Sequence, residues 1–130
     1  MLSQAERRLE NARGQARRGS PAYAVRLAQE CVELSLKAAM RFVGVDYPKM
    51  HDVNPTLLAV KDRFPIWFDA ERVAKMGGWL AERRAPGMYG DEYQGIPPDK
   101  LFSKKDSKLA LDYAEDVFAL CNKLRAKLRR

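Results

Sequence analysis

The sequence has little of what metal sites and disulfide frameworks are built from. Its 130 residues include two cysteines, Cys31 and Cys121, and one histidine, His51. Without a Cys-x-x-Cys pair, these residues are too few for a zinc site within one chain. Both cysteines lie in segments with helical apolar spacing, so we interpret them as small core residues. We expect no metal and no cofactor.

Long apolar runs are also missing. No stretch approaches the roughly 18 uninterrupted apolar residues that a membrane span needs. Residues 1–18 are charged throughout and lack the apolar region of a secretory signal. The length fits one domain, residues 1–130, which can bury a core without metal or disulfide staples. We therefore expect a cytoplasmic protein with no membrane partner.

Common catalytic motifs are absent as well. The sequence has no glycine-rich phosphate loop, no zinc-protease helix motif, no Gly-x-Ser-x-Gly elbow and no setting for a cysteine nucleophile. Any enzymatic function must therefore rest on other residues.

Charge of both signs is abundant, but it is unevenly placed. The net charge is +7. Residues 1–43 carry eight basic and four acidic residues (+4), residues 44–121 carry eleven and thirteen (−2), and residues 122–130 carry five basic residues alone (+5). Basic ends can attract RNA, DNA or an acidic protein surface. The alternative is that the last cations favour the end of a helix dipole and keep the protein soluble.

Apolar residues recur at steps of three or four along most of the chain, which predicts helices. A first helix is expected from Leu2 to Arg18. A second begins at the N-cap pair Ser20-Pro21 and ends near Val43, before Gly44. The second helix is apolar over most of its circumference and roughly 35 Å long, so we expect it at the centre of the fold.

Shorter elements follow. Residues 46–52 form a loop, and Asn54 is expected to cap a short helix that reaches about Arg63. Asp69 is expected to cap a helix through Arg84, weakened in its middle by Gly77-Gly78. Residues 85–102 form the least regular segment, and long ordered loops in compact domains are often functional.

Ser103 and Asp106 then resemble a capping box that starts the last helix. No β-pattern or internal repeat occurs. The predicted fold class is all-α, an antiparallel up-and-down bundle of four to five helices.

Two segments of the sequence resemble the HEPN domain family. Residues 28–38 (AQECVELSLKA) followed by 47–53 (YPKMHDV) are similar to the long second helix and the P-K-x-H-D loop of that family. Residues 89–92 (YGDE) and 96–98 (IPP) are similar to one prokaryotic branch. The resemblance covers about residues 3 to 125 and implies a HEPN-like antiparallel bundle, commonly a homodimer.

The resemblance also implies functions. HEPN proteins are often encoded beside a minimal nucleotidyltransferase, and the family is linked to nucleotide binding and to toxin–antitoxin pairs. Its ribonuclease members carry Arg-x4-6-His, in which the histidine serves acid–base chemistry and the arginine stabilises phosphate charge.

The sequence departs from that ribonuclease motif. The permitted positions upstream of His51 are occupied by Gly44, Val45 and Asp46, and none is arginine. Arg83 and Arg84 lie near the usual motif position, but Tyr89 stands where histidine is expected. Tyrosine is a poor base at neutral pH. We therefore expect no catalytic residues and a binding role.

The candidate ligand-binding residues come from two segments. Arg83 and Arg84 suit phosphate. Tyr89 and Tyr93 can stack on a base. Asp91 or Glu92 can hold ribose hydroxyls or a metal-bound phosphate. The loop before the third helix can line the same cleft if both segments lie at one end of the bundle. The candidates are Arg83, Arg84, Tyr89, Asp91, Glu92, Lys49, His51 and Asp52.

Each candidate also has a purely structural alternative. The arginines can be solvated cations at a helix end, and Tyr89 can pack its ring on the bundle. His51 can brace its loop, and Asp91-Glu92 can be an ordinary polar turn.

Three functions follow from these residues. The first is a homodimer that binds a nucleotide or RNA without cutting it and partners a minimal nucleotidyltransferase. The second is a metal-independent ribonuclease toxin with a degenerate site. The third is a helical interaction or scaffold module without a small ligand.

Overall fold

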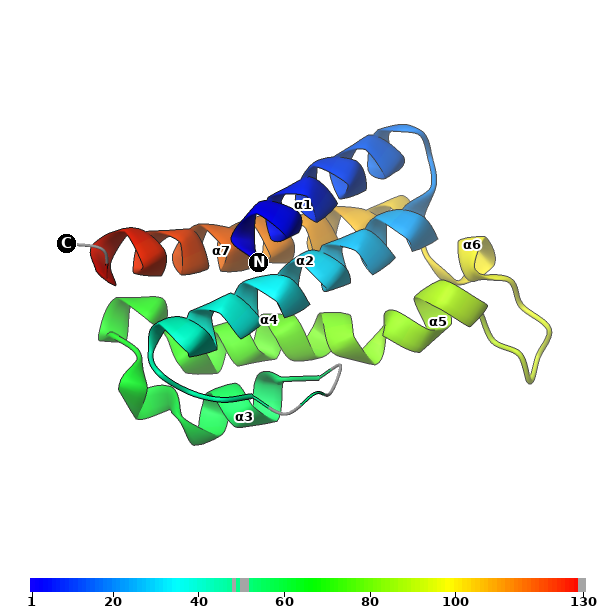
Figure 1. Cartoon of the computed structure of the whole chain (residues 1–130). Coiled ribbons are helices and arrows are strands. Elements are labelled where there is room, and N and C mark those ends of the chain that lie inside the picture. Colours follow the sequence, from blue (N-terminus) through cyan, green and yellow to red (C-terminus); the bar gives the residue numbers. More distant parts are fainter. Residues whose placement is uncertain (48, 50–51, 129–130) are drawn as a thin grey trace.

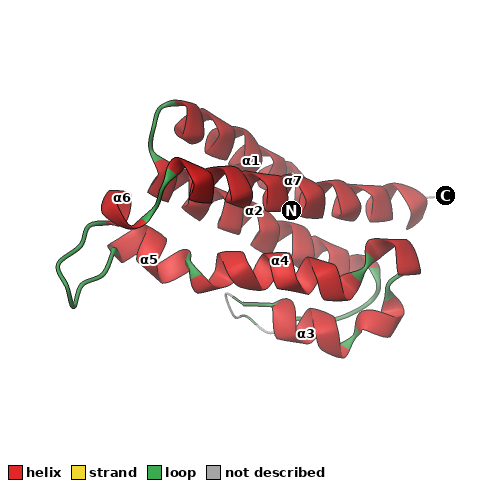
Figure 2. Cartoon of the chain, turned by 180° about the vertical axis from the view of Figure 1, so that it is seen from behind, coloured by secondary structure: helices red, strands yellow, loops and turns green. Residues whose placement is uncertain are grey.

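Four long helices of alternating direction form the body of the protein. The computed structural model describes residues 1–47, 49 and 52–128. The four are α1 (Leu2–Arg17), α2 (Pro21–Phe42), α4 (Ala70–Glu82) and α7 (Lys104–Leu128), and they run antiparallel (Figure 1). Helices and loops make up the described chain when it is seen from behind (Figure 2). The prediction of an all-α, up-and-down bundle is confirmed.

Short elements connect the long helices. They are α3 (Asn54–Ala59), the 3-10 turns η1 (Lys61–Arg63) and η2 (Ile66–Phe68), α5 (Arg84–Tyr89) and α6 (Pro98–Leu101). None of the helices in the described part of the chain combines the length and the apolar character that a membrane crossing requires.

Helix α2 lies at the centre, as its sequence predicts. It contacts α1, α4, α5, α6 and α7, and more than half of its 22 residues are buried. Cys31 on α2 and Cys121 on α7 are fully buried, which confirms their core role. Burial raises the pKa of the Cys31 thiol to about 12, and burial also raises the pKa of Cys121. Both thiols are therefore protonated and unreactive in the folded protein.

Most of the predicted helix starts are confirmed. Ser20 occupies the N-cap of α2 with Pro21 at its first position. The Asp69 carboxylate accepts a hydrogen bond from the Arg72 N–H (3.2 Å) at the start of α4. Before α7, the Asp106 N–H donates to Ser103 Oγ (3.2 Å), and the Ser103 N–H donates to Asp106 Oδ2 (2.8 Å). The capping box is complete, with aspartate in place of the usual glutamate.

The start of α3 differs from the prediction. Its N-cap is Val53, and Asn54 is the first helical residue and is buried. The Asn54 N–H and Nδ2 both donate to Asp52 Oδ1, at 3.1 and 2.6 Å. Asp52 therefore forms the local turn that leads into the helix. Helix α3 ends at Ala59, and the residues up to Arg63 form the tighter turn η1.

The fourth helix ends two residues earlier than predicted. Glu82 is the last residue of α4, Arg83 is its C-cap, and Arg84 begins α5. The Gly77-Gly78 pair lies within α4, where Gly77 is buried against the Asn54 side chain of α3. Gly77 therefore allows the two helices to approach closely, a role that the sequence did not reveal.

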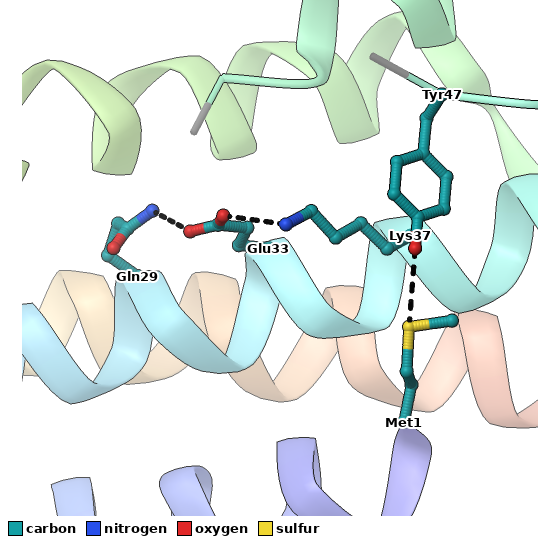
Figure 3. A network of polar contacts seen from close by, with 5 residues as sticks. All are labelled: Met1, Gln29, Glu33, Lys37 and Tyr47. Carbon is teal, nitrogen blue, oxygen red and sulfur yellow. Dashed lines mark hydrogen bonds and ion pairs between the residues drawn. The ribbon is translucent and has the colours of Figure 1, made fainter. Parts of the chain in front are cut away.

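A polar strip on α2 holds the loop that follows it (Figure 3). The Gln29 amide donates to Glu33 (3.2 Å), and the Lys37 ammonium pairs with the same carboxylate (3.0 Å). Lys37 also lies 5.7 Å from the centre of the Tyr47 ring. The Tyr47 hydroxyl contacts Met1 Sδ at 3.7 Å. The strip thus ties the loop to α2 and to the N-terminus.

Candidate functional site

The segment between α4 and α7 is more ordered than its composition suggests. Residues 90–97 form a hairpin loop that projects from one end of the bundle (Figures 1 and 2). The Asp91 N–H donates to the Ile96 carbonyl (2.7 Å), and the Ile96 N–H donates to the Asp91 carbonyl (2.9 Å). The Asp91 carboxylate accepts the Gln94 N–H (3.0 Å) and shapes the turn.

Gly90 is required where α5 meets this hairpin. Its φ of 70° and ψ of −157° lie in a region that is essentially restricted to glycine. A Cβ at this position would also overlap the Ile96 carbonyl oxygen. Gly90 therefore sets the direction in which the hairpin leaves α5.

Helix α5 and the hairpin form one wall of a groove, and the segment around the end of α6 forms the other. The groove has a volume of about 630 Å³ and is open to solvent. We call it the aromatic groove. It is lined by Ala85, Pro86, Tyr89, Gly90, Asp91, Glu92, Leu101 and Phe102. Among these described lining residues there are two carboxylates, two aromatic rings and no cation.

This lining suits a flat polar ring with hydroxyl groups. Tyr89 is 59% exposed, so its ring is free to contact a ligand. Leu101 and Phe102 supply an apolar wall, and the Asp91 and Glu92 carboxylates accept hydrogen bonds from hydroxyl or amino groups. In the parts of the chain that the structure describes, His, Cys, Asp and Glu side chains do not gather in threes as a metal site needs.

Three predicted site residues, Tyr89, Asp91 and Glu92, meet in the aromatic groove. Arg84 does not line it. Residues five positions apart on a helix point about 140° apart, so Arg84 and Tyr89 face different sides of α5. Tyr93 lies on the hairpin and is 99% exposed.

Arg83 is engaged within α4. Its guanidinium carbon lies 3.8 Å from the centre of the Trp79 ring, and its Nη1 donates to the Trp79 carbonyl (2.8 Å). It also lies 3.8 Å from the Glu82 carboxylate. Arg83 therefore braces the end of α4 through Trp79, and it is neither a groove residue nor the solvated cation of the structural alternative.

The other predicted group lies elsewhere. Lys49 and Asp52 belong to the loop between α2 and α3, and Asp52 is bonded to Asn54. Neither residue lines the aromatic groove, which is built from residues 85–102. His51 lies outside the described residues. The structure does not bring Lys49 and Asp52 to the groove.

Sequence reasoning missed the second wall of the groove. Leu101 ends α6 and Phe102 follows it, and both are half-buried. The available signal was Pro98, because proline at the first position is typical of a helix start. A short helix that starts at Pro98 places Leu101 and Phe102 against α5.

The described chain is thus an antiparallel helical bundle with a long central helix and an ordered segment before its last helix. Its sequence matches the model of the HEPN domain family over residues 1–124, and the chain belongs to this family. The crystal structure of TT1696 from Thermus thermophilus is similar, with a TM-score of 0.77 and 26% sequence identity over 95% of this chain and 94% of that chain. No curated protein matches the sequence. The resemblance seen in the sequence is confirmed.

Proposed function

We propose that this HEPN protein binds a nucleotide or single-stranded RNA in the aromatic groove without cutting it. The observation that carries the proposal is the exposed Tyr89 ring beside two carboxylates and an apolar wall. Stacking of a base on an aromatic side chain contributes about 1–3 kcal/mol whatever the base. Carboxylates are suitable acceptors for ribose hydroxyls.

Binding is favoured over cleavage because the acid–base pair is incomplete. Tyr89 occupies the position where the ribonuclease motif has histidine, and a phenol is a weak base at neutral pH. Arg84 lies on another side of α5, so the described residues do not pair an arginine with this hydroxyl. Cleavage of labelled RNA by the pure protein, abolished in His51→Ala, would contradict the proposal.

The proposal includes two partners, which rest on family membership. One is a second copy of the chain, and the other is a separately encoded minimal nucleotidyltransferase in a toxin–antitoxin-like pair. A solution mass of twice 14.8 kDa is expected for the homodimer, and a mass of 14.8 kDa would exclude the homodimer. Co-expression with the product of a neighbouring nucleotidyltransferase gene tests the second partner.

Calorimetric titration with 5′-AMP tests the groove directly. Tyr89→Ala should weaken binding at least about fivefold, because it removes the stacking surface. Tyr89→Phe keeps the ring and should bind like the wild type, and Glu92→Gln should bind more weakly. Ile66→Ala is the control, because Ile66 is 98% exposed on η2, outside the groove.

Two results would decide against the groove. Unchanged affinity in Tyr89→Ala would place the nucleotide elsewhere. Failure of the wild type to bind 5′-AMP or an oligonucleotide at millimolar concentration would favour the scaffold module without a small ligand.

A further inference from the structure

A second groove lies between the end of α1 and the start of α7. It has a volume of about 360 Å³ and an apolar floor. We call it the basic groove. It is lined by Arg13, Ala16, Arg17, Lys104, Ser107, Lys108 and Leu111. Four of these seven residues are cations, two from each helix.

Like charges lie side by side in the basic groove, and this repulsion does not favour folding. Arg13 and Arg17 are four residues apart on α1, and Lys104 and Lys108 are four apart on α7, which places like charges side by side on each helix. Lys104 is also the first residue of a 25-residue helix, where the dipole already carries partial positive charge. Arg17 is favoured by the dipole at the end of α1, but folding alone does not favour the like-charge pairs or Lys104, and a bound anion would offset their repulsion.

Nearby acids neutralise only half of these charges. Arg13 Nε pairs with Glu115 (3.0 Å), and Lys108 Nζ lies 3.4 Å from Asp112. Within the described ranges, Arg17 and Lys104 have no ion-pair partner. One free cation therefore faces the groove from each side.

The two grooves are neighbours. Phe102 lines the aromatic groove, and Lys104, two residues later, lines the basic groove. The views from both sides show the end of α1 and the start of α7 at the same end of the bundle as α5 and α6 (Figures 1 and 2). A strand of a few nucleotides that leaves one groove can therefore enter the other.

We infer that the basic groove binds the phosphate backbone of an RNA strand whose base lies in the aromatic groove. The inference rests on the proposed function and selects RNA over a mononucleotide as the ligand. The inference follows because the two grooves differ in charge. The described lining of the aromatic groove offers carboxylates and no cation, so the phosphates need a separate basic surface. Arg17 and Lys104 supply it, and arginine matches the geometry of phosphate oxygens.

The test compares 5′-AMP with an oligoadenylate of about eight nucleotides over a series of salt concentrations. The variant is the double substitution Arg17→Gln, Lys104→Gln. Oligonucleotide affinity should fall about tenfold or more in roughly 0.1 M salt, and the slope of log K against log salt should flatten by about 1.4, because two phosphate contacts are lost. Affinity for 5′-AMP should stay unchanged.

The matched control is Arg7→Gln, Lys75→Gln, which removes the same charge elsewhere. Arg7 lies about 15 Å before Arg17 along α1, and Lys75 is exposed on α4. This variant should keep both the oligonucleotide affinity and the salt slope of the wild type. An equal loss of oligonucleotide affinity in the control would show that net charge alone causes the effect, and would overturn the inference.

A stability measurement separates binding from a structural role. Because Lys104 is unfavourable at a helix N-terminus while Arg17 is favourable at a helix C-terminus, their double substitution should leave the melting temperature of the free protein nearly unchanged while weakening RNA binding. A lowered melting temperature together with lost binding would show that these residues act by supporting the fold, and would overturn the inference.

The remaining outcomes distinguish the two proposals. Binding of 5′-AMP that depends on Tyr89, with an oligonucleotide bound no more tightly, overturns the inference and leaves the proposed function standing. Oligonucleotide binding that depends on Arg17 and Lys104 but not on Tyr89 supports a binding role for the basic groove and excludes the aromatic groove from the binding site. Polyglutamate of equal length that binds as tightly as the oligonucleotide would identify a surface for acidic protein and overturn the assignment to RNA.

Discussion

The side chain of Asn54 lies directly against the α-carbon of Gly77. A Cβ at position 77 would overlap the Asn54 amide oxygen. The contact joins α3 to the middle of α4 and fixes the depth at which the short helix sits. Asn54 is itself held by its two hydrogen bonds to Asp52, so its amide has little freedom to withdraw.

Gly77→Ala should therefore destabilise the protein by about 1–3 kcal/mol, the usual cost of overpacking a filled interior. Gly78 is the matched control. It occupies the same helix, and a methyl group at this position would have no neighbouring atom within 4 Å. Gly78→Ala should stabilise by about 0.5–1 kcal/mol, because alanine is the better helix former. Chemical unfolding of both variants checks that the two changes in the free energy of unfolding have opposite signs. Equal changes would contradict the close contact between Asn54 and Gly77.

The capping box before α7 gives a second prediction. Ser103→Ala removes the hydroxyl that accepts the Asp106 N–H and should lower stability by about 1 kcal/mol. Ser3→Ala, at an exposed position on α1, should change stability by less than about 0.5 kcal/mol. Thermal unfolding compares the two. A neutral Ser103→Ala would mean that water replaces the cap at no cost.

Arg83 and Arg84 should differ in what they contribute to stability. Arg83→Ala loses the contact with the Trp79 ring and the bond to its carbonyl, and should cost about 1 kcal/mol of stability. Its affinity for 5′-AMP should be unchanged. Arg84 has no such partner in the described part of the chain and does not line the aromatic groove, so Arg84→Ala should leave both the stability and the affinity for 5′-AMP nearly unchanged. Unfolding and titration of both variants provide the check, and a loss of 5′-AMP affinity in either variant would place that arginine at the ligand.

Thiol reactivity provides a fourth prediction. Cys31 and Cys121 are fully buried with raised pKa values, so neither should react with a thiol reagent at about pH 8 until the protein unfolds. In the unfolded chain, both thiols lose their protons near pH 9, while in the folded chain they stay protonated. The folded state then binds more protons, so stability should fall as pH rises above about 9. Rapid labelling of one thiol in the native protein would contradict this.

Local signals predicted much of the fold. The starts of α2, α4 and α7 each have a capping residue at the expected place, and the apolar circumference of α2 placed it at the centre. These features depend on residues within one turn of each other. Sequence alone can therefore resolve them.

Contacts between distant residues explain the errors. Asn54 looks like a cap, but its place is set by Gly77, more than twenty residues later. Pro86 and Gly87 suggested a loop, yet α5 forms there. Pro86 is the third residue of α5, where its missing N–H has no helical partner to lose. The engagement of Arg83 has a local signal, since Trp79 lies four residues before it.

The grouping of the candidate residues was predicted in part for the same reason. Tyr89, Asp91 and Glu92 are close in sequence and meet in the groove. The wall at Leu101 and Phe102, and the separation of Lys49 and Asp52 from the groove, depend on how the chain turns between helices. No pattern in the sequence specifies that turn.

The hairpin at residues 90–97 is held to itself by two hydrogen bonds between Asp91 and Ile96, while α2 is enclosed by five other helices. Amide hydrogens of α2 should exchange only when the whole protein unfolds, and those at the tip of the hairpin should exchange through a small local opening. The proposed ligand contacts and the stability of the fold therefore lie in separate cooperative units. A substitution at Glu92 should therefore alter the proposed recognition at little cost to the bundle, which leaves this end of the molecule free to vary.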